Sequence, residues 1–226
     1  MASPGTRSTG LPDPEHYTTA RDIATLSVAL IREFPDIYAW FSTPQFTWNG
    51  ITQRNRNRLL TRDPTVDGIK TGFTDAAGYC LAASALRDGR RLVAAVLGTA
   101  SDKARTEAAS ALLNWGFRFS ETHRVYAAGQ PVTQVRVWKG EVEGLDLGLT
   151  GDLYVTVPQG RYEALDAKLD IEPRVLAPVA AGQSLGTLSV RLDDAELARR
   201  PLVATQAVPE GSFFSRIVDD VRLLFE

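Results

Sequence analysis

Val66-Asp67-Gly68-Ile69-Lys70-Thr71-Gly72 is the most informative segment for the architecture of the first half of the chain. It predicts a strand that runs up to the final glycine. Residues 79–86 and 91–97 predict two further strands, which are joined by Asp88-Gly89, a dipeptide typical of tight hairpins. The three runs together predict an antiparallel sheet.

Helices are expected on both sides of these strands. Residues 19–34 begin at Thr19, end before Pro35 and carry apolar residues at helical spacing: Ile23, Leu26, Leu30, Ile31 and Phe34. Residues 101–119 can begin with Ser101 as N-cap and carry a second apolar stripe: Ala104, Ala108, Ala111, Leu112 and Trp115. Residues 38–65 are irregular and predict a long loop with short turns. Three tryptophans are expected to pack in the core or between domains: Trp48, Trp115 and Trp138.

The pattern changes at about residue 122. Short apolar runs separated by glycines follow, at residues 132–138, 153–157, 165–171, 185–192 and 202–207. This spacing is typical of an all-β, sandwich-like domain. Residues 212–226 return to helical spacing with one apolar and one polar face, so this helix either packs on its own protein or lies in a membrane surface.

The composition excludes several classes of protein. The chain has 226 residues, is 44% hydrophobic and carries a net charge of -2, which suits a folded core and argues against disorder or a general nucleic-acid binder. The single cysteine, Cys80, excludes an internal disulfide framework. No run of about 18 apolar residues is present, and residues 1–7 lack the apolar middle of a secretory signal peptide.

Few residues have the spacing of a metal or nucleic-acid site. His16 and His123 are the only histidines, and with Cys80 they make no metal-ligand pattern, so no metal or cofactor is expected. The arginines at 54, 56, 58 and 62 are compatible with nucleic acid, but the net charge favours a solvated loop that holds one or two substrate-binding arginines.

Lys70-Thr71-Gly72 is the sharpest chemical signal. The lysine cation favours an anionic substrate group and tunes proton transfer, the threonine offers a hydroxyl, and the glycine lets a substrate backbone approach. Taken alone, the tripeptide is also explained by a solvated lysine on an edge strand. The sequence around it decides between these interpretations.

Longer stretches of sequence around this tripeptide match a known protein family. They are Phe46-Thr-Trp-Asn-Gly-Ile-Thr-Gln-Arg-Asn-Arg-Asn-Arg-Leu-Leu60, then Val66 to Gly72, Ala77-Gly78, Leu112-Leu-Asn-Trp-Gly116 and Gly211-Ser-Phe-Phe-Ser-Arg216. On these stretches, which reach nearly the whole chain from about residue 10, it resembles the D-alanyl-D-alanine carboxypeptidases. These are the low-molecular-mass penicillin-binding proteins of the serine peptidase class.

The resemblance implies an α+β fold in three parts. A partial penicillin-binding, β-lactamase-like catalytic domain is expected over 1–121, a β domain over 122–209 and an amphipathic membrane-surface helix over 210–226. The implied activity is a serine-type hydrolysis that removes the terminal D-Ala from peptidoglycan stem pentapeptides through an acyl-enzyme. The implied partners are stem peptides, β-lactams and, through 212–226, the periplasmic face of the inner membrane, with no nucleic acid.

The resemblance also implies roles for five residues. Lys70 corresponds to the catalytic lysine that lines the cleft, and Thr71 and Gly72 to the substrate-binding strand. Arg56 and Arg105 correspond to cations near the terminal carboxylate of the substrate, where guanidinium groups bind well. The alternative for both arginines is an ordinary surface position.

The chain departs from the family in one respect. Its lysines are 70, 103, 139 and 168, and the residues three positions earlier are Asp67, Ala100, Arg136 and Leu165, so no Ser-x-x-Lys motif is present. No serine is followed two positions later by Asn either. Because serine needs a nearby base, we expect this chain alone to be inactive. The alternatives are a catalytically inactive binding or complementing fragment and, less favoured, a β-lactamase relative.

Overall fold

The computed structural model describes residues 15 and 17–223, and the chain divides into two compact units, Met1–Phe119 and Ser120–Glu226. The division falls two residues before the boundary expected from the sequence, because a strand begins directly at Ser120. His16 and the last residues of the predicted terminal helix, 224–226, lie outside the described residues.

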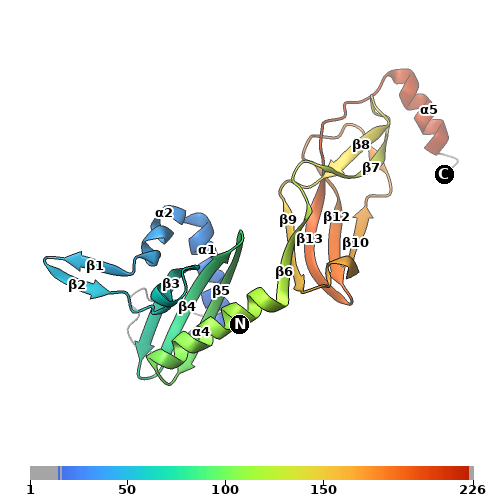
Figure 1. Cartoon of the computed structure of the whole chain (residues 1–226). Coiled ribbons are helices and arrows are strands. Elements are labelled where there is room, and N and C mark those ends of the chain that lie inside the picture. The colour runs from blue at the N-terminus through green and yellow to red at the C-terminus, as the bar shows by residue number, and fades with distance from the viewer. Residues whose placement is uncertain (1–14, 16, 224–226) are drawn as a thin grey trace. The chain divides into compact units, whose positions relative to one another are not determined.

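The first unit is built on a three-stranded antiparallel sheet of order β3-β4-β5 (Figure 1). Its strands are β3 (Val66–Thr74), β4 (Gly78–Arg87) and β5 (Arg90–Thr99), which confirms the three predicted strands. Lys70 pairs with Ala82 on β4, and β3 is an edge strand with no partner on its other side among the described residues. Val66 to Gly72 therefore lies along an edge of this sheet as far as the described residues show.

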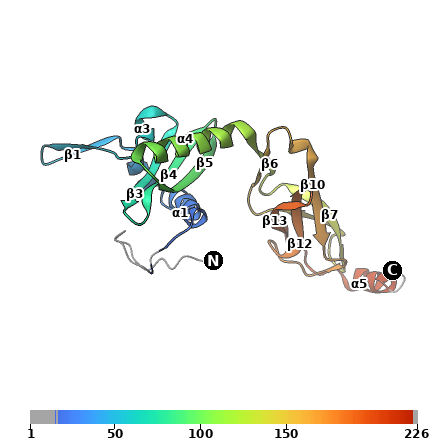
Figure 2. The ribbon, with the colours of Figure 1, turned by 90° about the horizontal axis from the view of Figure 1, so that it is seen from below.

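Helices cover the two faces of this sheet (Figures 1 and 2). α4 (Asp102–Phe119) packs through Ala109 and Leu113 on the face that carries Leu81, Ala83 and Ala85. α1 (Ala20–Glu33) packs on the other face through Ile23, Leu30 and Ile31. Alternation along β4 sends successive side chains to these two cores.

The predicted helix starts are confirmed by side-chain caps. The Thr19 hydroxyl accepts from the Asp22 amide at 3.1 Å, and the Ser101 hydroxyl accepts from the Ala104 amide at 3.1 Å. Two expectations about buried faces are wrong. Leu26 and Phe34 of the α1 stripe are exposed. Leu112 and Trp115 of the predicted α4 stripe are exposed as well, and the helix buries a neighbouring face instead: Arg105, Thr106, Ala109 and Leu113.

The expected loop over 38–65 is the largest error of the sequence-based assignment. The structure has α2 (Pro35–Tyr38), a 3-10 helix (Ala39–Ser42), the hairpin β1 (Gln45–Trp48) and β2 (Ile51–Arg54), and α3 (Leu59–Arg62). Asn49 and Gly50 close the hairpin with φ values of 49° and 75°. An Asn-Gly pair is a strong hairpin signal that the sequence contains. Trp48 on this hairpin and Trp115 on α4 are exposed, whereas Trp138 is buried as expected.

The second unit is β-rich, as predicted. A sheet of order β10-β12-β13-β8-β7-β11 and a separate pair β6–β9 enclose one apolar core, which includes Leu145, Leu147, Leu188 and Leu202. The expected strand at 202–207 overlaps only the last three residues of a longer strand, which begins at Ala195 and ends at Ala204. Three strands, β6, β8 and β11, have no counterpart among the predicted runs. The strands are β6 (Ser120–Tyr126), β7 (Pro131–Trp138), β8 (Gly144–Gly148), β9 (Leu153–Pro158), β10 (Leu165–Ile171), β11 (Val175–Leu176), β12 (Ser184–Leu192) and β13 (Ala195–Ala204), with a 3-10 turn at Tyr162–Ala164.

A short helix, α5 (Phe213–Leu223), follows the second sheet. The Asp219 carboxylate, 8% exposed, accepts from the Lys139 backbone amide at 2.7 Å and so ties this helix to the end of β7. Within the described part of the chain, no helix is long and apolar enough to span a membrane.

Candidate functional site

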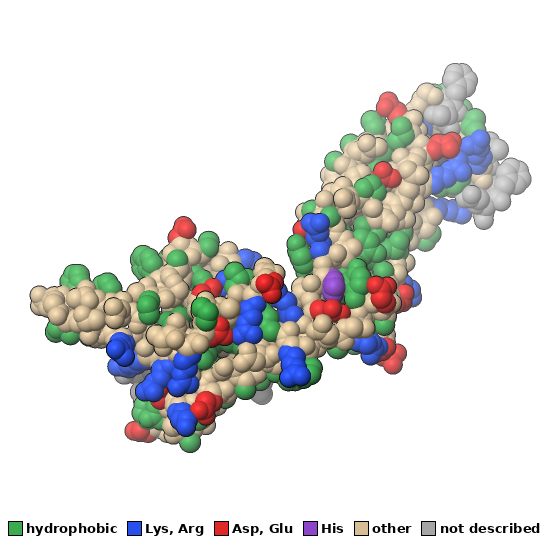
Figure 3. Space-filling view, in the orientation of Figure 1, with side chains coloured by type: hydrophobic (Ala, Val, Ile, Leu, Met, Phe, Trp, Pro, Cys, Tyr) green, Lys and Arg blue, Asp and Glu red, His purple; other side chains and the backbone are tan. Residues whose placement is uncertain are grey.

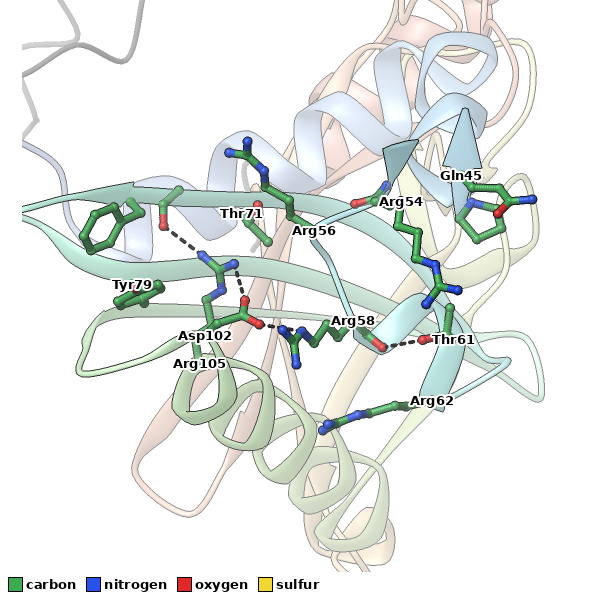
Figure 4. Close-up of a pocket in the computed structure, with 14 residues that line it drawn as sticks. Gln45, Arg54, Arg56, Arg58, Thr61, Arg62, Thr71, Tyr79, Asp102 and Arg105 are labelled. Carbon is green, nitrogen blue, oxygen red and sulfur yellow. Dashed lines mark hydrogen bonds and ion pairs between the residues drawn. The ribbon is translucent and has the colours of Figure 1, made fainter. Parts of the chain in front are cut away.

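A cleft of about 1090 Å³ lies in the first unit, beside the end of β3 (Figure 4). Its walls come from the base of the β1–β2 hairpin, from α3, from β3 and β4, and from the start of α4. Five arginines and one carboxylate line it: Arg54, Arg56, Arg58, Arg62, Arg105 and Asp102. The cleft is therefore strongly basic although the whole chain is slightly acidic.

Arg105 is the most deeply buried of these cations, with 5% of its surface exposed. It forms an ion pair with Asp102 (Figure 4). It also donates to the carbonyl oxygens of Gly72 at 3.0 Å and Cys80 at 3.4 Å. Its ring neighbour is Tyr79, with the guanidinium carbon 5.4 Å from the ring centroid. These contacts make Arg105 a positioning group for the end of β3, since most of its donors are already used by the protein.

Asp102 joins two of the arginines. Besides Arg105 it binds Arg58, whose Nε lies 2.5 Å from the second carboxylate oxygen (Figure 4). Arg54, Arg56 and Arg62 form no ion pair with any described residue. Unpaired guanidinium groups on the wall of a concave site favour an anionic ligand, because they bind carboxylates in a bidentate manner.

The Lys-Thr-Gly residues lie at the junction of two hollows. Thr71 and Gly72 line the basic cleft, and Thr71 is 7% exposed. Lys70 lines a neighbouring hollow of about 460 Å³ together with Arg56 and Thr71, and its Nζ donates to the Thr71 carbonyl oxygen. The structure thus brings Thr71, Gly72, Arg56 and Arg105 together in one cleft and places Lys70 at its border.

A polar network that sequence reasoning missed holds the start of β3. Asp67 accepts from the Tyr38 hydroxyl at 2.6 Å and from two nitrogens of Arg91 at 2.8 and 2.7 Å. Asn57, 2% exposed, donates to the Gly68 carbonyl at 2.9 Å. Lys70 therefore follows a segment that is fixed from three directions. The residues come from α2, β3, β5 and the segment between β2 and α3, so no local pattern could have revealed them.

The hydrogen bonds of this network change the pKa values of the Asp67 carboxyl and the Tyr38 hydroxyl. Burial alone would raise the pKa of the Asp67 carboxyl, but the hydrogen bonds from Arg91 and Tyr38 outweigh it and hold the pKa below its usual range. Burial, and then the bond to Asp67, raise the pKa of the Tyr38 hydroxyl to about 12. The network keeps Asp67 ionised and Tyr38 neutral around pH 7.

Metal-ligating side chains do not gather in the part of the chain that the structure describes: no group of three or more His, Cys, Asp or Glu residues could hold an ion there. Cys80, half-buried on β4, lies at the border of the site.

Two sequence-family models match the chain, and they divide it as the structure does. Residues 6–101 match D-alanyl-D-alanine carboxypeptidase, and residues 121–210 match the C-terminal domain of penicillin-binding protein 5. The chain belongs to the D-alanyl-D-alanine carboxypeptidase family. The resemblance noted from the motifs is thereby confirmed, and so is the α+β fold.

Individual members of the D-alanyl-D-alanine carboxypeptidase family are similar over nearly the whole chain. The Escherichia coli K12 proteins DacA and DacC are 42% and 41% identical over 218 residues, which is 96% of this chain and 54% of each relative. The crystal structure of penicillin-binding protein 5 from Haemophilus influenzae is 36% identical, with a TM-score of 0.82 over 88% of this chain and 59% of that chain. The chain thus spans about half the length of the curated relatives it matches.

Proposed function

We propose that this chain carries the substrate-recognition part of a serine-type D-Ala-D-Ala carboxypeptidase of peptidoglycan maturation. The single observation that carries the proposal is the basic cleft beside Thr71 and Gly72, where three arginines have no ion pair with a described residue. A stem pentapeptide ends in a carboxylate, which is the ligand that such a cleft favours. The removal of the terminal D-Ala would take place at this strand.

The edge position of β3 supports this assignment. β3 has a described neighbour on one side alone, and an extended peptide can add to such an edge as a further strand. The carbonyls of Gly68, Thr71 and Gly72 already accept from side chains, so a peptide would meet the remaining outward groups of the strand. A peptide bound in this way beside Gly72 would bring its terminal carboxylate towards Arg56 and Thr71, which lie close together in the cleft (Figure 4). Lys70 would supply positive charge beside the reacting bond.

We further propose that the chain alone performs recognition without catalysis. A serine acts as nucleophile when a base lies within hydrogen-bond reach, and no Ser-x-x-Lys motif is present in the 226 residues. Ser27 shares an apolar hollow with Lys70, but its hydroxyl donates to the Ile23 carbonyl at 2.7 Å. The second candidate function, a binding or complementing fragment of the family, is favoured by the same observation.

Peptide binding tests the recognition proposal. Chemical shifts of the Thr71 and Gly72 amides should change on titration with a peptide that ends in D-Ala-D-Ala, and much less with its C-terminal amide. Arg56→Gln should remove this difference, whereas Arg174→Gln, an exposed arginine of the second unit, should not. Equal binding of the acid and the amide would refute the proposal.

The location of the chain is a separate proposal, the periplasmic face of the inner membrane. The side chains of Phe213, Ile217 and Val218 on α5 are 66%, 45% and 49% exposed, while Asp219 ties the helix to β7. Exposed apolar side chains on one helix suit shallow insertion into a membrane surface. Co-sedimentation with liposomes should decrease when residues 212–226 are deleted. Unchanged binding would refute the proposal that this segment attaches the chain to a membrane surface.

A further inference from the structure

We propose that the apolar face of the β1–β2 hairpin, together with Trp40, is a binding site for an uncharged, N-acetylated glycan strand. The inference deepens the proposed function, on which it rests, by assigning a place to the sugar part of peptidoglycan. The site is a groove of about 700 Å³ beside the basic cleft.

The hairpin is amphipathic and carries no buried residue. Cross-strand pairing places Phe46, Trp48, Ile51 and Gln53 on one face and Gln45, Thr47, Thr52 and Arg54 on the other. Trp48 is 75% exposed, Phe46 63% and Ile51 62%, and Trp40 at the edge of the same groove is 74% exposed. Green hydrophobic side chains are visible on this projecting hairpin in Figure 3. An exposed aromatic cluster of this kind marks an interaction surface.

The polar residues of the groove indicate what kind of ligand it takes. Gln53 lies on the apolar face, and the pair Gln45 and Arg54 lines the groove at the base of the hairpin. Neither glutamine side chain forms a hydrogen bond with any described residue, and Arg54 is the one charged lining residue among those described. Indole rings offer flat apolar surface to the C–H faces of pyranose rings, and amides offer hydrogen bonds to hydroxyl and acetamido groups. This combination suits a neutral amino-sugar polymer better than an anionic ligand.

The groove and the cleft are continuous. Gln45, Arg54 and Asn55 line both of them. The cleft is basic and the groove is nearly uncharged, which mirrors a peptidoglycan strand with its anionic stem peptide and its neutral glycan. A group of Lys and Arg side chains lies next to the hairpin in Figure 3. One substrate could therefore occupy both surfaces.

The groove is held in shape before any ligand binds. Thr47 and Thr52 share a hydrogen bond of 2.8 Å across the hairpin, on the face away from the tryptophans. At the hairpin base, Asn55 donates through its amide side chain to the Thr43 carbonyl at 3.1 Å and through its backbone to the Pro44 carbonyl at 2.8 Å. A preformed surface loses less conformational entropy on binding.

The test titrates the full chain with a tetramer of β-1,4-linked N-acetylglucosamine. Binding is monitored by NMR through the indole N–H signals of the four tryptophans. The Trp40 and Trp48 signals should shift, and those of Trp115 should not. Trp48→Ala should weaken binding about tenfold, whereas Trp115→Ala, which removes a 63% exposed indole from α4, should leave it unchanged. Gln53→Leu, which keeps the apolar face, should reduce the preference for this tetramer over cellotetraose.

The outcomes separate this inference from the proposed function. If the glycan leaves the Trp40 and Trp48 signals unmoved while the D-Ala-D-Ala peptide binds, the glycan site is wrong and the peptide cleft stands. If the glycan binds and the peptide does not, the groove is supported and the peptide assignment fails. Trp48-dependent binding to zwitterionic vesicles without any glycan response would overturn the glycan assignment in favour of a lipid surface.

Discussion

Replacing Asp67 by Asn should destabilise the Met1–Phe119 unit by about 2 kcal/mol. Asp67 accepts hydrogen bonds from the Tyr38 hydroxyl and from two Arg91 nitrogens, all between 2.6 and 2.8 Å. Asn keeps one acceptor oxygen and turns an N–H₂ group towards a guanidinium donor, which leaves a charged N–H without a partner. An unpaired group of this kind lowers the free energy of unfolding by about 1–3 kcal/mol. The side chains of Arg91 and Asp67 are 27% and 28% exposed, which places the expected loss of stability in the middle of this range.

Native-state hydrogen exchange on the full chain measures this loss unit by unit. The amides of Ala83 and Ala85 on β4 report the first unit and that of Leu188 on β12 the second, since all three residues are 0% exposed. Exchange of the first pair should accelerate about 30-fold in Asp67→Asn. The matched control is Asp193→Asn in the second unit.

The control pair has the same chemistry but more solvent around it. Asp193 binds Arg161 at 2.9 and 3.0 Å, with the side chains 67% and 44% exposed, so its loss should stay below about 1 kcal/mol. Because the pKa of Asp67 is lowered on folding, its contribution is present above the ordinary carboxyl pKa and is lost as the pH falls through the folded-state value. Equal losses in the two variants, or an undiminished Asp67→Asn effect in strong acid, would show that the ionised Asp67 carboxylate does not stabilise the first unit.

Asn57→Ala should lower the stability of the same unit by about 2 kcal/mol in thermal melts, because the Gly68 carbonyl loses its donor. Gly186→Ala should cost the second unit about 2 kcal/mol, since the new Cβ would lie 2.6 Å from a backbone oxygen of β10, whereas Gly151→Ala meets open space and serves as its control. The phenolate signal of Tyr38, identified by its absence in Tyr38→Phe, should appear near pH 12 in an ultraviolet titration, because burial and then the Asp67 carboxylate raise the pKa of the hydroxyl. A midpoint near pH 10 would contradict this expectation.

Local signals were sufficient for the sheet of the first unit. Asp88 and Gly89 have φ values of 50° and 78°, the conformation that a two-residue hairpin turn requires, so the sequence could mark the turn between β4 and β5. The same turn chemistry is present at Asn49 and Gly50, but the strands beside it bury no residue and therefore show no core-facing pattern that would mark them as strands. A hairpin of this kind is recognisable from its turn alone.

The site could be predicted only in part. The Lys-Thr-Gly tripeptide and Arg56 lie in stretches that match the family, so their neighbourhood followed from the motifs. The engagement of Arg105 by Asp102 and by the Gly72 carbonyl could not be foreseen, because it depends on how α4 lies against β3. The burial of Arg105 on α4 likewise reverses the expected apolar stripe, since a charged residue occupies the face that the helix turns inward.

We propose that this chain recognises the substrate without supplying a serine nucleophile. Intact-mass spectrometry after incubation with a fluorescent penicillin examines this proposal, with a family member that contains Ser-x-x-Lys as positive control. We expect an unchanged mass and no retained label on this chain. A stable mass increase of one penicillin, mapped to a serine such as Ser27 beside Lys70, would contradict it.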